Sequence, residues 1–201
     1  MVRAPRRAPP LLALALAAVA AGCGVGVRAP ASPAAVPLDL QVQLQERFYP
    51  VSGRNARSLN RALALNGPRS AGRSAHALTE WHLDWSYRPV NNGSGCSARP
   101  AVSVSVVTTL PRWVDRAGAS EGLVSDWALF LARLRDHEAI HQYMALEGGR
   151  ELLQQLGSLV APDCVQLEQE AQQLVSSLQA SYQEEHRRFD LESEYGRRPT
   201  P

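Results

Sequence analysis

The sequence contains no lysine, so all 21 of its basic residues are arginine. Three of them precede Cys23, which leaves 18 arginines against 19 Asp and Glu and a net charge of −1 for the remainder. The positive net charge of +2 for the whole chain therefore belongs to its first segment. Beyond Cys23 we find no basic stripe with interleaved aromatic residues, so the sequence does not predict a nucleic-acid-binding surface.

Long apolar runs are also missing at the start of the chain. Leu11 to Ala21 is apolar, but its eleven residues are too few to span a bilayer as a helix. A start with three arginines precedes this run and small residues follow it, which is typical of an export signal. The ending at Gly22-Cys23 resembles the lipobox of bacterial lipoproteins, and this implies cleavage after Gly22 and lipid attachment to Cys23.

These features predict three segments. Residues 1–22 are expected to be a signal peptide of the lipoprotein type, and residues 23–37, rich in Ala, Pro, Val and Gly, a flexible tether. Residues 38–198 have the length of one domain. We expect a monomer in the cell envelope, anchored by its lipid as a periplasmic or outer-membrane lipoprotein. Ordinary secretion is the alternative, and no nucleic-acid partner is expected.

The chain has only three cysteines. If Cys23 carries a lipid, Cys96 and Cys164 remain, and in an oxidising compartment they are expected to form a disulfide. The long loop that such a bridge closes predicts a stabilisation of about 4 kcal/mol. Two free buried thiols are the alternative.

The motif His137-Glu138-Ala139-Ile140-His141 is the zinc-peptidase pattern H-E-x-x-H. Four residues make just over one helical turn, so both imidazoles leave the same face and can bind one ion at about 2.0–2.1 Å. Glu138 lies about 100° around the helix, where it can accept a proton from the water that zinc activates. The histidines belong to an apolar stripe with Phe130, Leu134 and Met144, which places them on a buried face. One such histidine is often a core residue, but a pair beside a glutamate favours metal binding.

Periodicity predicts strands first and long helices after them, and hence an α+β fold. The expected architecture is a small antiparallel sheet packed against the long motif helix and a second C-terminal helix, the minimal arrangement of zincin-type peptidases. Strand 79–88 is the candidate edge strand that aligns an extended substrate, and Gly148-Gly149 weakens the expectation of one continuous motif helix. The predicted elements are strands 40–51, 79–88 and 101–110 and helices 55–66, 120–156 and 164–191.

Several short pieces resemble a family of bacterial exported proteins of unassigned role, labelled as secreted zinc-dependent peptidases. The matching pieces lie at residues 49–53, 79–87, 110–113, 137–141 and 189–196, together with Cys96, Trp127 and Cys164. In that family the last piece usually reads Tyr-Asp-x-x-Thr-x-His-Gly. This chain carries Phe189, Ser193 and Tyr195 where the family has Tyr, Thr and His.

A catalytic zinc site needs a third protein ligand and an open position. Glu147, the choice by metzincin spacing, lies about 9 Å beyond His141 on an unbroken helix and is discounted. His186, Asp190, Glu194 and Tyr195 remain on or after the last helix. The resemblance favours Asp190, which keeps its family position, and His186 is the alternative by ligand chemistry.

The sequence thus predicts a zinc-dependent peptidase of the bacterial cell envelope, with zinc on His137, His141 and Asp190 and with Glu138 as general base. Its expected partners are a peptide or protein substrate and, through Cys23, the membrane. The alternative is an envelope lipoprotein that acts as a non-catalytic zinc-binding or protein-interaction module. A metal-dependent hydrolase of another envelope polymer, such as peptidoglycan, is a third possibility.

Overall fold

The computed structural model describes residues 39–70 and 72–194. The predicted signal peptide, tether and lipidation site at Cys23 lie outside the described residues. The long elements occur where the sequence predicts them, and two short strands that the sequence analysis did not predict, Arg69–Ser70 and Arg73–Ser74, form a separate pair. In chain order the elements are β1 (Asp39–Val51), α1 (Ala56–Asn66), β2 (Arg69–Ser70), β3 (Arg73–Ser74), β4 (Leu78–Asn91), β5 (Cys96–Trp113), α2 (Glu121–Ser158), β6 (Val160–Ala161) and α3 (Cys164–Glu192).

The main sheet has the strand order β1-β5-β4, with β6 paired to the start of β5. Strand β4 pairs with β5 in antiparallel fashion, but β1 pairs with β5 in parallel over their whole common length. The prediction of an antiparallel sheet is therefore wrong for β1, and the sheet is mixed. A parallel pair needs a long return connection, and the segment from α1 through β4 supplies it by running back along the sheet before β5 begins.

One face of the sheet is covered by helices. On β5 the residues that face α2 are buried, while from Ala101 to Thr109 the residues that alternate with them are only half-buried and point to the opposite face. The buried set is Val102, Val104, Val106, Thr108 and Leu110. Leucines of α2 and small residues of α3 complete this core. The alternation explains why β5 was predictable from sequence, since a half-buried strand has period two.

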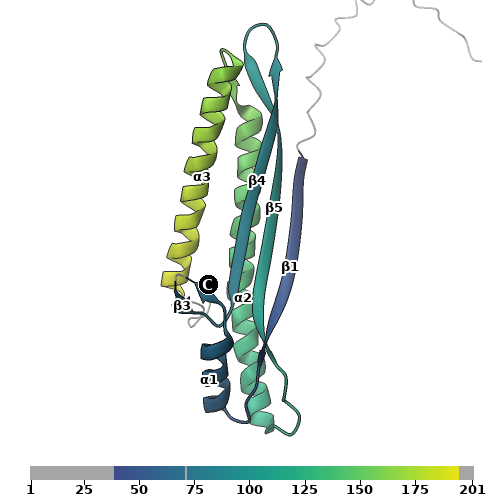
Figure 1. Cartoon of the computed structure of the whole chain (residues 1–201), viewed down its shortest axis with the longest axis vertical. Coiled ribbons are helices and arrows are strands. Elements are labelled where there is room, and N and C mark those ends of the chain that lie inside the picture. Colours follow the sequence, from purple (N-terminus) through teal and green to yellow (C-terminus); the bar gives the residue numbers. More distant parts are fainter. Residues whose placement is uncertain (1–38, 71, 195–201) are drawn as a thin grey trace, which may run out of the picture. The chain divides into compact units, whose positions relative to one another are not determined.

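Helix α2 runs along the sheet without interruption, and α3 lies beside it (Figure 1). The Ser120 side chain accepts a hydrogen bond from the Leu123 amide at the start of α2. Gly148 and Gly149 do not break the helix, because both are sites of close packing. A Cβ at Gly149 would lie 2.3 Å from Cγ2 of Val104, and one at Gly148 would lie 3.3 Å from the ring of Tyr182. None of the three described helices has a stretch long and apolar enough to cross a membrane.

Gly149→Ala should lower the free energy of unfolding by up to about 2 kcal/mol. The added methyl group overpacks the contact between α2 and β5 at a cost of about 1–3 kcal/mol, and a helix-propensity gain of about 1 kcal/mol offsets part of this cost. Gly122→Ala is the matched control on the same helix, since nothing lies within 4 Å of its added Cβ, and it should be neutral or stabilising. Denaturant unfolding of both variants checks this, and equal effects would contradict the packing role of Gly149.

The Cys96–Cys164 disulfide is present, with a Cα–Cα distance of 5.1 Å. It joins the first residue of β5 to the first residue of α3, next to the short pairing of β5 with β6. From this fixed start α3 runs back along α2, and its last turns reach the level of the H-E-x-x-H motif. Because the helix rises about 1.5 Å per residue, Asp190 lies about 39 Å from the bridge.

The pieces at residues 49–53 and 110–113 have a structural role. They pair with each other where β1 and β5 end, and Val51 is opposite Trp113. The indole nitrogen of Trp113 donates hydrogen bonds to the Gly53 carbonyl at 3.1 Å and to Asp115 at 2.9 Å. Asp115 also accepts a hydrogen bond from the Gly53 amide at 3.0 Å. These contacts hold the parallel strand ends together and support the cluster in which α1 packs.

Candidate metal centre

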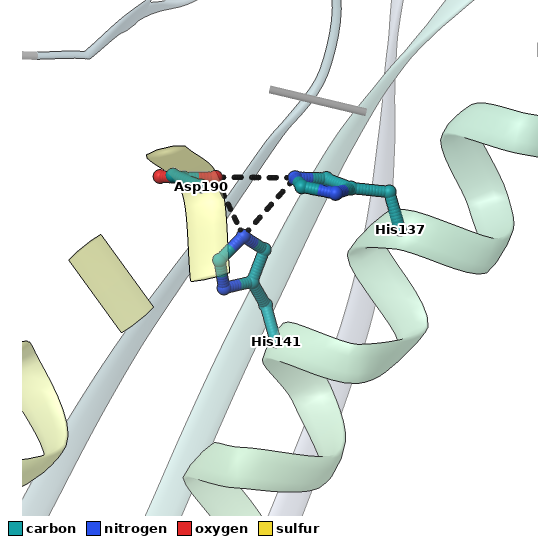
Figure 2. A group of neighbouring side chains, drawn as sticks. All are labelled: His137, His141 and Asp190. Carbon is teal, nitrogen blue, oxygen red and sulfur yellow. Dashed lines mark hydrogen bonds and ion pairs between the residues drawn. The ribbon is translucent and has the colours of Figure 1, made fainter. Parts of the chain in front are cut away.

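His137 and His141 project from one face of α2, and Asp190 reaches them from the last turn of α3 (Figure 2). Oδ1 of Asp190 lies 3.1 Å from Nε2 of His137 and 3.0 Å from Nε2 of His141. The two Nε2 atoms are 3.2 Å apart. Both histidines are buried, as the apolar stripe predicts, with exposed fractions of 3% and 6%.

These three atoms form a nearly equilateral triangle that could hold a metal ion. In a tetrahedral site with ligands at about 2.0–2.1 Å, the ligand atoms are separated by about 3.3–3.4 Å. The observed separations of 3.0–3.2 Å are close to this value. Two imidazoles and a carboxylate are also a donor set that divalent transition metals accept, so geometry and chemistry agree.

The surroundings of His137 favour the tautomer that a ligand needs. Its Nδ1 lies 3.3 Å from Oγ of Ser193, and that hydroxyl donates its own hydrogen to the Phe189 carbonyl at 2.7 Å. Ser193 can therefore accept a hydrogen bond from Nδ1 of His137, and an imidazole proton held there would leave the lone pair on Nε2 free to face a metal ion in the triangle. The ring of Phe189 stacks on His137 with centroids 4.8 Å apart and fixes its plane.

The second imidazole has a partner of a different kind. Nδ1 of His141 lies 2.8 Å from Nδ1 of His186, so one nitrogen donates and the other accepts. When His141 donates, its Nε2 lone pair faces Asp190 and the metal position. His186 then carries its proton on Nε2, which is buried and has no hydrogen-bond partner within the described part of the chain. Burial lowers the pKa of His186 to about 4, and Trp81 of β4 stacks on its ring, so it is neutral near pH 7.

Asp190 supplies the negative charge of the centre. Burial acts to raise the pKa of Asp190, but hydrogen bonds from His137 and His141 outweigh it and hold this pKa below its ordinary value. Its side chain is 28% exposed, more than either imidazole. Asp190 is therefore ionised at neutral pH and is the most accessible of the three candidate ligands.

Glu138 points to the sheet side of the same centre. Its side chain is buried, with 4% exposed, and Oε2 has no hydrogen-bond partner among the described residues. Burial raises the pKa of Glu138 above its ordinary value, against a hydrogen bond from Thr79 and the charges of the two imidazoles. A carboxylate with one free oxygen and a raised pKa is suited to accept a proton.

The other candidates from the sequence lie outside the triangle. His186 contacts His141 and is not one of the three residues that could share an ion. Glu147 forms an ion pair with Arg150 on the surface of α2. Glu194 is not in the group either, and Tyr195 lies outside the described residues.

Sequence reasoning did not identify the polar residues that support the centre. Thr79 hydrogen-bonds Glu138, and Thr108 and Gln142 extend this contact across β5 and α2. One sign was readable, since Thr108 interrupts the alternating valines of β5 at a buried position. Ser193 was noted only as a family substitution, and its contact with His137 could not be read from spacing.

Comparison with known proteins identifies a family and no function. A family model described as "Bacterial protein of unknown function (DUF922)" matches residues 46–196, which include both histidines, Glu138, Asp190 and the disulfide. No curated protein and no solved structure matches the chain.

Proposed function

The chain belongs to this bacterial family of unknown function, and from that premise we propose that it is a zinc-dependent peptidase of the cell envelope. One observation carries the proposal. A three-atom triangle of metal-ligand size lies beside a buried glutamate that has one unpartnered oxygen. This is the donor set of a catalytic zinc site, which has three protein ligands and a nearby base.

A bound zinc ion would lower the pKa of its water toward 7 and polarise the scissile carbonyl. His137, His141 and Asp190 would hold the ion, and Ser193 and His186 would keep the two imidazoles in the ligating tautomer. Glu138 would accept the proton of the attacking water at Oε2 and pass it to the leaving amine. Its desolvation makes it a stronger base than a glutamate in water.

The position of β4 supports a peptide substrate. Within the described sheet β4 pairs only with β5, so its other edge has free backbone donors and acceptors. Thr79 and Trp81 of this strand contact Glu138 and His186, so the free edge passes the centre. An extended peptide that pairs with β4 would present its backbone to Glu138.

Metal analysis and a peptidase assay test this function. After reconstitution and removal of free metal, the protein should carry about one zinc per chain, because the α2 histidines and Asp190 would form one site. Hydrolysis of casein or an envelope extract should stop with a chelator and return with zinc. A protein that retains no zinc after reconstitution would refute the proposal.

A second candidate is a non-catalytic zinc-binding or protein-interaction module. The observation that favours it is the burial of both imidazoles, of which 3% and 6% is exposed, since structural zinc sites are closed. The free oxygen of Glu138 favours the enzyme, because a structural site has no use for an unpaired buried carboxylate oxygen.

The cellular location is part of the proposal and rests on the sequence. A lipid on Cys23 and a tether of residues 23–37 would hold a monomeric domain at a membrane of the envelope. The Cys96–Cys164 disulfide supports an oxidising compartment.

A further inference from the structure

A row of polar side chains crosses the apolar sheet beneath Glu138. Thr108 of β5 is 2% exposed and lies between Val106 and Leu110 in the buried set that faces α2. In the sheet register Thr108 is directly opposite Thr79 of β4. All other members of the buried set on β5 are Val or Leu, so hydrophobic packing alone does not account for a hydroxyl at this level.

The hydrogen bonds along this row have a fixed direction. The amide nitrogen of Gln142 can only donate, and it lies 2.8 Å from Oγ1 of Thr108, which therefore accepts. Oγ1 of Thr108 lies 3.0 Å from Oγ1 of Thr79. Thr108 then has its own hydrogen available for Thr79, and Thr79 can in turn donate to the Glu138 carboxylate that it contacts.

This direction points every donor toward Glu138. Helix α2 supplies both ends of the chain, because Gln142 lies one helical turn after Glu138. The two strands supply the hydroxyls between them. Thr79 thus contacts the carboxylate of Glu138, whose Oε2 has no hydrogen-bond partner among the described residues.

A purely structural role does not account for this row of hydrogen bonds, because burying its polar groups costs free energy. A buried hydroxyl is stabilised only if it is hydrogen-bonded, and a Val of similar shape would fill position 108 without that requirement. The chain also ends on a buried carboxylate with a free oxygen, which a structural network would have paired.

We propose that Gln142, Thr108 and Thr79 form a positioning chain that fixes one carboxylate oxygen of Glu138 and directs the other, Oε2, to the proton it accepts. The inference rests on the proposed peptidase function. It identifies Thr79 and Thr108 as positioning residues, since they would act on the reaction through Glu138. Without the chain, the carboxylate could rotate within its buried site and lose its orientation.

The experiment compares isosteric and hydroxyl-retaining variants in the full-length, zinc-loaded protein. Thr79→Val removes the hydroxyl with little change of shape, and kcat should fall by about tenfold. KM and zinc content should be unchanged, and Thr79→Ser should restore most of the rate. Thr108→Val should lower kcat in the same direction without lowering the thermal unfolding midpoint, because Val continues the apolar row of β5.

Two further measurements separate this role from packing. In the Glu138→Gln background, Thr79→Val should not lower the residual rate of hydrolysis any further. In the metal-free protein, the shifts that Thr79→Val and Glu138→Ala cause in the unfolding midpoint should be non-additive, because each change removes one partner of the hydrogen bond, and this readout needs no assay of activity.

Normal kcat in Thr79→Val beside an active wild type would overturn the positioning chain and leave the peptidase intact. Failure of Thr79→Ser to recover the rate would also overturn it. A wild type that holds zinc and hydrolyses no peptide would instead overturn the proposed function, and with it the role of the chain.

Discussion

Glu138→Gln should abolish peptide hydrolysis while zinc and fold are retained. General base catalysis contributes about 10²–10⁴-fold to rate, and the amide cannot accept the proton, so kcat should fall by at least that range. The site of the change is buried and does not belong to the metal triangle, so zinc content should stay at one per chain. A casein assay with metal analysis of the same sample measures both effects.

Glu147→Gln is the matched control for this change. It alters the same residue type on the same helix, but Glu147 lies at the surface in an ion pair with Arg150. It should leave kcat within about twofold, because a surface ion pair contributes little. Equal activity of Glu138→Gln and wild type would show that Glu138 is not the general base. The second candidate function, a non-catalytic zinc-binding or protein-interaction module, would then be favoured.

The elements of the fold were predictable because their signals are local. The period-two alternation of β5 and the cap at Ser120 can be read in a short window of sequence. The pairing of β1 was not predictable. It depends on which strand lies beside β1 after the chain has returned through α1 and β4. Alternation predicts which face of a strand is buried, and it does not distinguish a parallel from an antiparallel neighbour.

The same contrast between local signals and contacts of distant segments applies to the site. The spacing of His137 and His141 places both imidazoles on one helical face by geometry alone. Asp190 was identified through a family resemblance, since no local pattern connects residues that lie 49 and 53 positions apart in the sequence. The contact of Thr79 with Thr108 depends on strand register, and periodicity carries no information on register between distant strands.

Gly148-Gly149 shows how packing overrides helix propensity. Two adjacent glycines predict a weak helix, at about 1 kcal/mol each relative to alanine. In the structure Gly149 allows α2 to approach Val104 of β5. This close contact holds the motif helix against the sheet, so the residues that weaken the isolated helix help to position Glu138 over Thr79.

Asp190→Ala should weaken zinc binding by more than about 100-fold. The change removes one of three candidate ligands and the charge that faces both imidazoles, with Oδ1 at 3.0 and 3.1 Å from their Nε2 atoms. Loss of an outer-shell partner costs about 10–100-fold, and loss of a ligand should exceed it. Competition with a chromogenic chelator gives the dissociation constant, and circular dichroism verifies that the variant is folded.

His186→Ala provides the decisive comparison, because His186 lies one turn earlier on α3 and its hydrogen bond to the centre goes to Nδ1 of His141, the nitrogen that faces away from the triangle. If Asp190 is the ligand and His186 a tautomer-fixing partner, the His186 variant should lose at most about 100-fold in affinity. Glu192→Ala, an exposed carboxylate on the same helix, should not change the affinity. The reverse order, with His186→Ala the more severe, would show that His186 binds the metal and that Asp190 only orients the imidazoles.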